Sequence, residues 1–171
     1  KESLVGELNA GWSVAKALLK HERKLMSELG SESASAEYQP IECARIYLPL
    51  EEGRVADAVM RDALARHELQ MHARGLTQLR ILEESRAGTG TGLTPLIMKY
   101  CGTEEEKRKK ELMLAMMGSQ GLGWEGEEFN AAEIDTARQC LFSKAISIAG
   151  GTTEVQLNII AKRALDLPGV T

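Results

Sequence analysis

The sequence contains few of the residues that mark sheets, disulfides or metal sites. Aromatic residues make up only 4% of its 171 residues and proline occurs 4 times, which disfavours a β-sandwich and leaves long helices uninterrupted. No Cys-x-x-Cys or His-Glu-x-x-His pattern occurs, so we expect no metal site. The three cysteines, Cys43, Cys101 and Cys140, are isolated and odd in number. We predict that they are small apolar fillers in a reducing compartment rather than disulfide partners.

The chain also lacks an excess of positive charge and any long apolar run. Its net charge of −4 disfavours a nucleic-acid-binding surface, and any bound polyanion must be held by local groups. No apolar run reaches about 18 residues and no secretory signal is recognisable, so we expect no membrane span. The length suits one domain over residues 1–171, and the abrupt start at Lys1 suggests a fragment of a longer protein.

The residues that are abundant favour helices. Hydrophobic residues make up 43% of the chain, and Ala, Leu, Met, Glu and Lys are the helix-forming residues in which it is rich. Periodicity and glycine-rich breaks predict five helices, near residues 6–29, 52–85, 93–117, 132–147 and from 152 onward. The polar stretch 30–37 predicts a flexible loop, and a short turn is expected near residues 47–50.

Two groups of polar residues have unremarkable interpretations. The run Glu104–Glu111 contains three favourable i,i+4 pairs and is interpreted as a solvated helix turn, with a binding surface as the alternative. The pairs are Glu104–Arg108, Glu105–Lys109 and Glu106–Lys110. His67 and His72 have no partner motif, so we interpret them as surface residues or core filler.

A Gly-Gly turn precedes the last predicted helix. Gly150 and Gly151 allow backbone angles that a Cβ forbids, and Thr153 with Gln156 fits a capping box. Leu167-Pro168 then ends the helix. Bare backbone before a capped helix start exposes N–H groups at the positive end of the helix dipole. The segment suits a phosphate, a polarised carbonyl or a cofactor hydroxyl, although a glycine pair before a helix is usually just a tight connection.

One carboxylate falls on the apolar stripe of the first predicted helix. The stripe consists of Leu8, Trp12, Ala15, Leu19, Glu22, Met26 and Leu29. If that stripe is buried, the pKa of Glu22 should rise unless the carboxylate is paired, and a carboxylate of this kind is a useful general base. The alternative is that Glu22 pairs with a cation such as Arg23, or lies where the stripe meets solvent.

The segment from Ile146 to Pro168, ISIAGGTTEVQLNIIAKRALDLP, closely resembles the last helix of the acyl-CoA dehydrogenase family. These flavoenzymes desaturate acyl-CoA thioesters. The resemblance implies an all-α fold, an up-down four-helix bundle with an additional C-terminal helix. It also implies that the N-terminal helical domain and the middle β-domain of the family are absent from this chain. The isolated domain is therefore expected to be inactive, while the full-length protein is an enzyme.

The resemblance also implies where the catalytic base lies. Most members carry a glutamate immediately before the Gly-Thr of the last-helix turn, and here that position is Gly150. A second branch, typified by isovaleryl-CoA and long-chain dehydrogenases, carries the base on the first helix of the domain, in an Asp-x-Glu-Arg motif. The segment Lys20-His21-Glu22-Arg23 occupies that position, with Lys20 replacing the Asp. Glu22 is thus the implied catalytic base.

The other implied site residues bind substrate or FAD. Arg23, Gly150 and Gly151 are expected to contact the thioester substrate, with the Gly150 N–H polarising its carbonyl. Thr152 and Glu154 align with residues that approach FAD, with Glu154 in place of the commoner Gln. Gly118 and Ser119 resemble a Gly-Gly-x-Gly turn that meets the FAD of a neighbouring subunit.

The sequence departs from the family pattern at two of these cross-subunit FAD contacts. Ala115 stands where many members have Gln. The Arg-x-x-Phe-Gly segment that follows the first helix in the family is missing, and Arg45 or Arg54 is at most a substitute. Both departures weaken the expectation of tight cross-subunit FAD binding.

The expected partners follow from the same resemblance. They are an acyl-CoA substrate, a homodimeric or homotetrameric assembly through the bundle, and an acceptor such as an electron-transfer flavoprotein. A cytoplasmic location is expected, or the mitochondrial matrix in a eukaryote, in fatty acid metabolism. Two other functions stay open: a non-catalytic helical oligomerisation or interaction bundle, and an acyl-CoA oxidase or flavin monooxygenase of the same fold.

Overall fold

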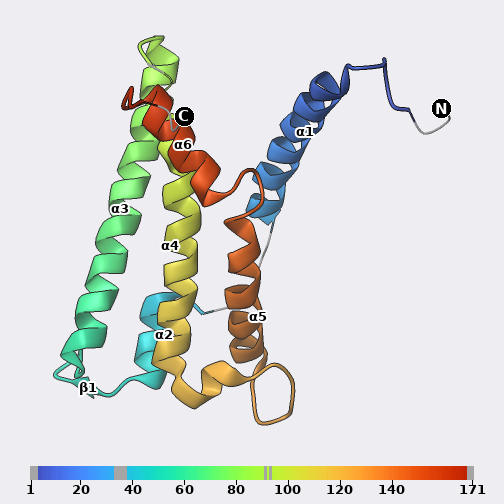
Figure 1. Cartoon of the computed structure of the whole chain (residues 1–171). Coiled ribbons are helices and arrows are strands. Elements are labelled where there is room, and N and C mark those ends of the chain that lie inside the picture. The colour runs from blue at the N-terminus through green and yellow to red at the C-terminus, as the bar shows by residue number, and fades with distance from the viewer. Residues whose placement is uncertain (1–3, 33–37, 91, 93, 169–171) are drawn as a thin grey trace. The chain divides into compact units, whose positions relative to one another are not determined.

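The computed structural model describes residues 4–32, 38–90, 92 and 94–168 (Figure 1). Within these ranges the chain forms helices and one short hairpin, which confirms the predicted all-α fold class. The elements are α1 (Gly11–Glu32), α2 (Pro40–Tyr47), β1 (Leu50–Glu51), β2 (Arg54–Val55), α3 (Ala58–Ala87), α4 (Thr94–Met117), the 3-10 helix η1 (Gly118–Leu122), α5 (Ala131–Ile146) and α6 (Thr153–Arg163). The chain divides into two units, Lys1–Ser35 and Ala36–Thr171, and each is described by itself.

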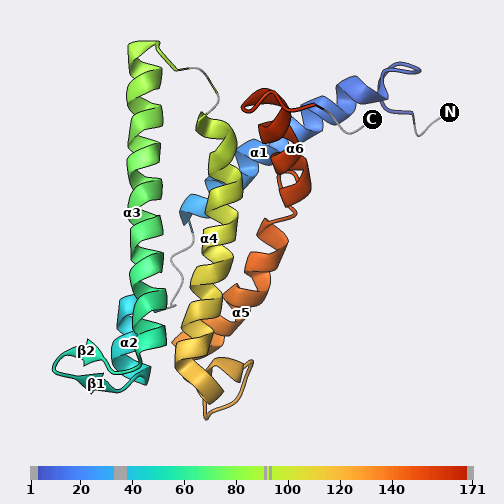
Figure 2. The same cartoon turned by 60° about the vertical axis from the view of Figure 1, so that its left-hand side comes forward.

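In the second unit α3, α4 and α5 run alternately up and down, with α4 between the other two (Figures 1 and 2). The α-helix α6 packs against α4 as well. The bounds of α4 and α5 lie within one residue of those predicted from the sequence. The breaks between them are glycines in left-handed backbone, with φ of +67° at Gly88 and +58° at Gly118. These three helices are the antiparallel core of the predicted bundle.

The first helix differs from its prediction at both ends. It begins at Gly11 rather than near residue 6, because Gly6 and Asn9 have φ of +78° and +68°, which no α-helix contains. Leu8 therefore lies outside the helix and does not belong to its stripe. At the other end α1 continues to Glu32, into the stretch predicted as a loop. Residues 33–37 of that stretch lie outside the described ranges.

The sequence reading missed α2 and the hairpin that follows it. Pro40 at the first position of α2 and Glu42, whose carboxylate accepts a hydrogen bond from Gln39 N at 3.4 Å, form a helix start. Glu52 and Gly53 both have positive φ, +50° and +76°, which makes a tight two-residue turn between β1 and β2. The helix predicted from residue 52 consequently begins at Ala58, after the cap Asp57.

The hydrophobic core of the second unit lies among α2, α3 and α4. Cys43 and Met113 are completely buried, and the Cys43 thiol lies 3.6 Å from the Met113 carbonyl oxygen. The other buried apolar members of this cluster are Ala44, Leu64, Met116 and Met117. On the other side of α4, the small residues Thr136, Ala137, Cys140 and Ser143 of α5 are buried. Thr136 and Ser143 donate their hydroxyls to carbonyls of their own helix, so their burial leaves no unpaired hydroxyl.

The prediction that all three cysteines are fillers is right for two of them and wrong for the third. Cys43 and Cys140 are buried, but Cys101 is exposed on α4. Burial raises the pKa of the Cys43 thiol to about 11, and it also raises the pKa of Cys140.

Iodoacetamide at pH 8 should therefore label Cys101 and spare the other two cysteines of the folded chain. The thiolate is the reactive form, and a thiol with a pKa near 11 is roughly one part in a thousand ionised at pH 8. Mass spectrometry of tryptic peptides measures the label at each site, with the urea-unfolded chain as the control in which all three react. Equal labelling of Cys43 and Cys101 in the folded chain would contradict the described core.

Candidate functional site

The connection between α5 and α6 is a glycine turn with bare backbone. Gly150 and Gly151 have φ of +68° and +103°, as their predicted conformational role requires. A Cβ at Gly150 would meet nothing within 4 Å, so the space beside it is open. A Cβ at Gly151 would lie 2.8 Å from Gln156 Nε2, so the end of that side chain would have to move, and the positive φ would strain any residue other than glycine.

Both glycine carbonyls are held by side chains from helices. Gln156 Nε2 donates to Gly150 O at 3.2 Å, and Lys99 Nζ donates to Gly151 O at 2.6 Å. Lys99 also donates to Ser147 O at 3.2 Å, so its ammonium joins the two ends of the turn. Burial lowers the pKa of Lys99, while the Glu104 carboxylate opposes that effect. Sequence patterns did not single out Lys99, because its acceptors lie about 50 positions further along the chain.

The predicted capping box of Thr153 and Gln156 is not formed at the start of α6. Thr152, not Thr153, is the N-cap, and its hydroxyl accepts a hydrogen bond from Val155 N at 3.4 Å. The hydroxyl of Thr153 instead donates to Glu104 Oε1 on α4 at 3.2 Å. Gln156, expected to complete a capping box with Thr153, is the residue that holds Gly150.

Glu154 presents a carboxylate in the first turn of α6. A hydrogen bond from its own backbone N–H, and another from Thr152, lower its pKa. Negative charge at a helix N-terminus is favourable, so the group stays ionised at neutral pH. An exposed carboxylate here accepts hydrogen bonds from hydroxyl or N–H donors and repels phosphate.

Gly118 and Ser119 lie at the opposite end of α4 from this turn. Gly118 opens η1, and both residues are exposed. At about 1.5 Å per residue along α4, Gly118 lies roughly 28 Å from Lys99. The predicted cofactor residues thus form two separate groups within one chain, Thr152 with Glu154 and Gly118 with Ser119.

Glu22 lies on α1, in the first of the two units, Lys1–Ser35. Its side chain is half-buried, whereas Trp12 on the same helix is 71% exposed and Leu19 is 42% exposed. Trp12 and Leu19 are thus exposed in this chain, whereas Ala15 is half-buried. The side chain of Arg23 lies outside the described part of the structure, as do those of Lys20, Met26 and Leu29.

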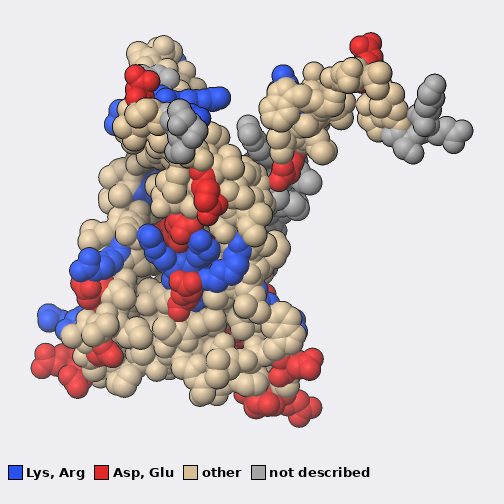
Figure 3. Space-filling view, in the orientation of Figure 1, with Lys and Arg blue, Asp and Glu red and all other residues tan. Residues whose placement is uncertain are grey.

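The charge run of α4 is not simply the solvated turn that its sequence indicates. Basic side chains do gather over the middle of α4 in Figure 3, with acidic ones above and below. The predicted pair Glu106–Lys110 is present at 3.2 Å, and Glu104 pairs with Lys107 at 2.7 Å. Lys110 and Glu105, however, are buried. Although every residue of the run 104–111 is charged, two of its side chains are therefore buried in the folded chain.

Glu105 pairs with His67 across the α3–α4 interface. Its Oε1 lies 2.6 Å from His67 Nδ1, and the side chains are only 6% and 7% exposed. Arg108 lies 3.9 Å from the other oxygen of Glu105. Of the two interpretations of His67, the core position is confirmed, and the structure adds its partner Glu105; His72 is exposed.

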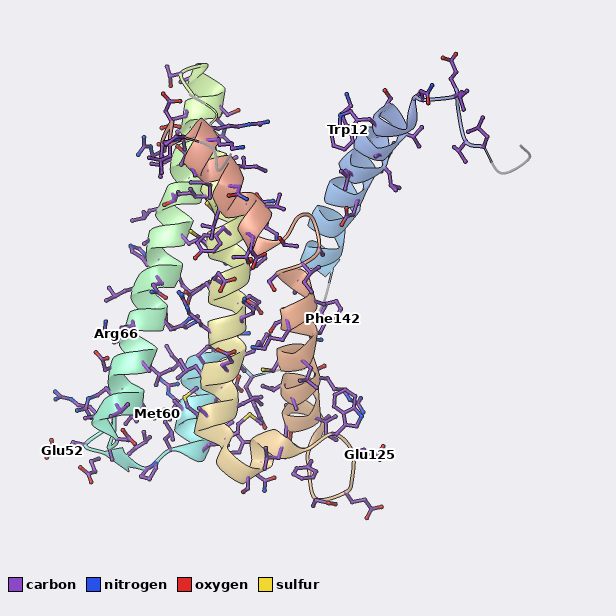
Figure 4. All side chains as sticks on the ribbon, viewed as in Figure 1. Trp12, Glu52, Met60, Arg66, Glu125 and Phe142 are labelled. Carbon is purple, nitrogen blue, oxygen red and sulfur yellow. The ribbon has the colours of Figure 1, made fainter. Side chains whose placement is uncertain are left out.

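A cavity of about 270 Å³ lies in the same α3–α4 groove. Its walls include Arg74, Ile97, Met98, Tyr100, Cys101 and Arg108. Beside it, Arg66 projects outward from α3 (Figure 4), where it pairs with Asp62 at 2.7 Å. The cavity is separate from the glycine turn.

Two classes of site are not found in the described ranges. No group of three or more His, Cys, Asp or Glu is arranged there to hold a metal ion. None of the described helices combines the length and apolarity needed to cross a membrane.

The comparisons with known proteins agree on one family. Residues 9–165 match the family model described as acyl-CoA dehydrogenase, C-terminal domain. "Acyl-CoA dehydrogenase IpdE1" of Mycolicibacterium smegmatis is 31% identical over 165 residues, which are 96% of this chain and 39% of that protein. "Acyl-CoA dehydrogenase FadE34" of Mycobacterium tuberculosis is 27% identical over 168 residues, which are 98% of this chain and 21% of that protein. No solved structure matches significantly.

A third relative, "Acyl-CoA dehydrogenase IpdE1" of Mycobacterium tuberculosis, is 32% identical over 171 residues, covering 96% of this chain and 40% of that protein. The chain therefore spans between about a fifth and two fifths of the length of the curated relatives it matches.

Proposed function

Because the chain belongs to the acyl-CoA dehydrogenase family, matching its C-terminal domain, we propose that it is the C-terminal part of a flavin-dependent enzyme that desaturates an acyl-CoA thioester. The observation that carries the proposal is the glycine turn before α6. It has space beside Gly150, and Lys99 and Gln156 hold its carbonyls by hydrogen bonds. Residues 1–171 form a single helical domain of that enzyme.

The residues of the turn suit the flavin that this family uses. Gly150 and Gly151 both have positive φ and carry no side chain, and a Cβ at Gly150 would meet nothing within 4 Å, so a planar or polyhydroxylated group can approach the backbone there. Thr152 is half-buried and Glu154 is an exposed, ionised carboxylate. These acceptors fit the hydroxyl and ring N–H groups of a flavin better than its phosphates. Bound FAD supplies the acceptor for the hydride that leaves the β-carbon.

Glu22 and Gly150 have different roles in the reaction of the substrate. Glu22 removes the α-proton as general base, a role that suits a half-buried carboxylate on the first helix of the domain. The Gly150 N–H donates to the thioester carbonyl and stabilises the negative charge that develops on its oxygen as the proton leaves. Arg23, adjacent to the base, binds the substrate. Gly118 and Ser119, at the far end of α4, contact the FAD of a neighbouring subunit.

Exposed apolar side chains indicate where the rest of the enzyme packs. Trp12 on α1 and Phe142 on α5 (Figure 4) are 71% and 60% exposed. Leu141, next to Phe142 in the sequence, is 63% exposed. Apolar patches of this kind are usually covered by another domain or subunit. We assign them to contacts with other parts of the enzyme and with the other subunits of a homodimer or homotetramer. An electron-transfer flavoprotein in the cytoplasm or mitochondrial matrix then reoxidises the enzyme.

The full-length protein should convert a saturated acyl-CoA into its 2-enoyl-CoA when an artificial electron acceptor is supplied. Mass spectrometry detects this as the loss of two hydrogens, and a substrate with both α-hydrogens replaced by methyl groups is the control that cannot react. Peroxide formation without the acceptor would reassign the protein as an oxidase. FAD-free protein that converts no member of a broad acyl-CoA panel would favour a non-catalytic helical bundle.

A further inference from the structure

Lys99 holds the segment 147–151 at both ends. Its ammonium donates to Ser147 O at 3.2 Å and to Gly151 O at 2.6 Å. Between these two carbonyls lies the Gly150 N–H, the group that the proposed function places against the thioester. Lys99 stands on α4, which packs against both α5 and α6, so the clamp is anchored outside the turn that it holds.

The turn needs such a clamp because its glycines are conformationally free. A peptide unit is planar, so fixing a carbonyl oxygen also fixes the direction of the following N–H. Lys99 fixes the peptide after Gly151, and Gln156 fixes the peptide after Gly150. On the N-terminal side, Ala149 N donates to Ala145 O at 3.0 Å. The Ala149–Gly150 peptide is therefore bracketed on both sides by restrained backbone.

A second link runs from α4 to the other side of the turn. Glu104 accepts a hydrogen bond from the Thr153 hydroxyl at 3.2 Å and is itself held by Lys107 at 2.7 Å. The hydrogen bond from Lys107 is the main reason that the pKa of Glu104 is lowered. Two successive turns of α4 thus hold the segment before α6 and the first residue of α6.

We propose that Lys99 is a positioning residue, whose ammonium clamps Ser147 O and Gly151 O so that the Gly150 N–H is held in place to polarise the thioester carbonyl. This inference rests on the proposed function. The alternative is that Lys99 only satisfies the carbonyls at the C-terminal end of α5, where a cation is favourable in any helix. The two roles differ in what a Lys99 variant does to the chemical step.

The test compares Lys99→Met with wild type in the full-length protein, with the exposed Lys162→Met on α6 as control. Methionine keeps the apolar stem and removes the ammonium. We expect hydrogen–deuterium exchange of the amides in residues 148–153 to rise about tenfold or more, because the glycines regain their freedom. We expect flavin reduction by bound acyl-CoA to slow roughly 100-fold, as when one oxyanion donor is misplaced, while substrate Kd changes little.

A second variant covers the case in which Lys99→Met does not fold. Gln156→Leu releases the other carbonyl of the turn without touching the α4–α5 interface, and the same two changes are expected at smaller size, with flavin reduction about tenfold slower. If Lys99→Met folds and its flavin reduction stays within threefold of wild type, the positioning role is overturned. If only Gln156→Leu folds, the same result for that variant overturns it. Exchange of residues 148–153 that is unchanged in Lys99→Met also overturns it.

The exchange measurement needs neither flavin nor substrate. If the wild type reduces no flavin with any acyl-CoA, the proposed function fails, while the exchange result still decides whether Lys99 holds the turn.

Discussion

Replacement of Glu22 by Gln in the full-length protein should lower the rate of acyl-CoA desaturation roughly 10²- to 10⁴-fold, the usual contribution of a general base. Glutamine has nearly the same shape but cannot accept the α-proton. Because the change leaves the glycine turn and the helix of Glu22 intact, flavin content and substrate affinity should stay close to those of the wild type. Steady-state turnover, the flavin spectrum and a thioester-binding titration measure the three quantities.

The base can also be tested apart from the redox step. In D₂O, a thioester that cannot be oxidised should exchange its α-protons in the wild type and not in Glu22→Gln. Glu7→Gln, an exposed glutamate before α1, is the matched control and should behave as the wild type. Full turnover in Glu22→Gln would mean that another group removes the proton, and the proposed branch of the family would be wrong.

Breaking the buried His67–Glu105 pair should cost this chain far more stability than breaking any surface pair. Either His67→Leu or Glu105→Leu alone should lower the free energy of unfolding by about 3–5 kcal/mol, since each leaves a buried polar partner without its hydrogen bond. The double variant replaces the pair with apolar side chains and should lie within about 1 kcal/mol of the wild type. Urea unfolding followed by circular dichroism measures all three variants.

The exposed pair Arg80–Glu84 on α3 is the control for this cycle. Its atoms are 2.6 Å apart, but the Arg80 side chain is 70% exposed, so Arg80→Ala should change stability by less than about 1 kcal/mol. Additive losses in the double variant of His67 and Glu105 would contradict the described pairing, because residues that interact directly give non-additive changes.

The elements that the sequence predicted well are those with local signals. The ends of α4 lie close to Gly92 and Gly118, and α5 lies between the glycine-rich loop that follows α4 and the Gly150–Gly151 pair, so both helices were placed within one residue. The Gly150–Gly151 turn was predicted for the same reason, because a glycine pair allows the positive φ that both residues adopt. The start of α1 was misplaced because Leu8 fits the stripe although Asn9 interrupts the helix.

The residues that the sequence did not predict depend on contacts between distant segments. Lys99 resembles any helical lysine until α4 and the α5–α6 turn are brought together. Glu105 belongs to a run that is hydrophilic throughout, and only the approach of α3 shows that it faces inward to His67. The short helix α2 does carry a local signal, Pro40 followed by Glu42, but eight residues are too few for periodicity to reveal it.

The most direct test of Glu22 as the base of a flavin-dependent desaturation is anaerobic titration of the full-length protein with a panel of acyl-CoA thioesters, wild type beside Glu22→Gln. We expect at least one thioester to bleach the flavin absorbance of the wild type, and the variant to bind the same thioester while its flavin stays oxidised. Bound flavin that no thioester bleaches in the wild type, or equal bleaching in both proteins, would contradict it.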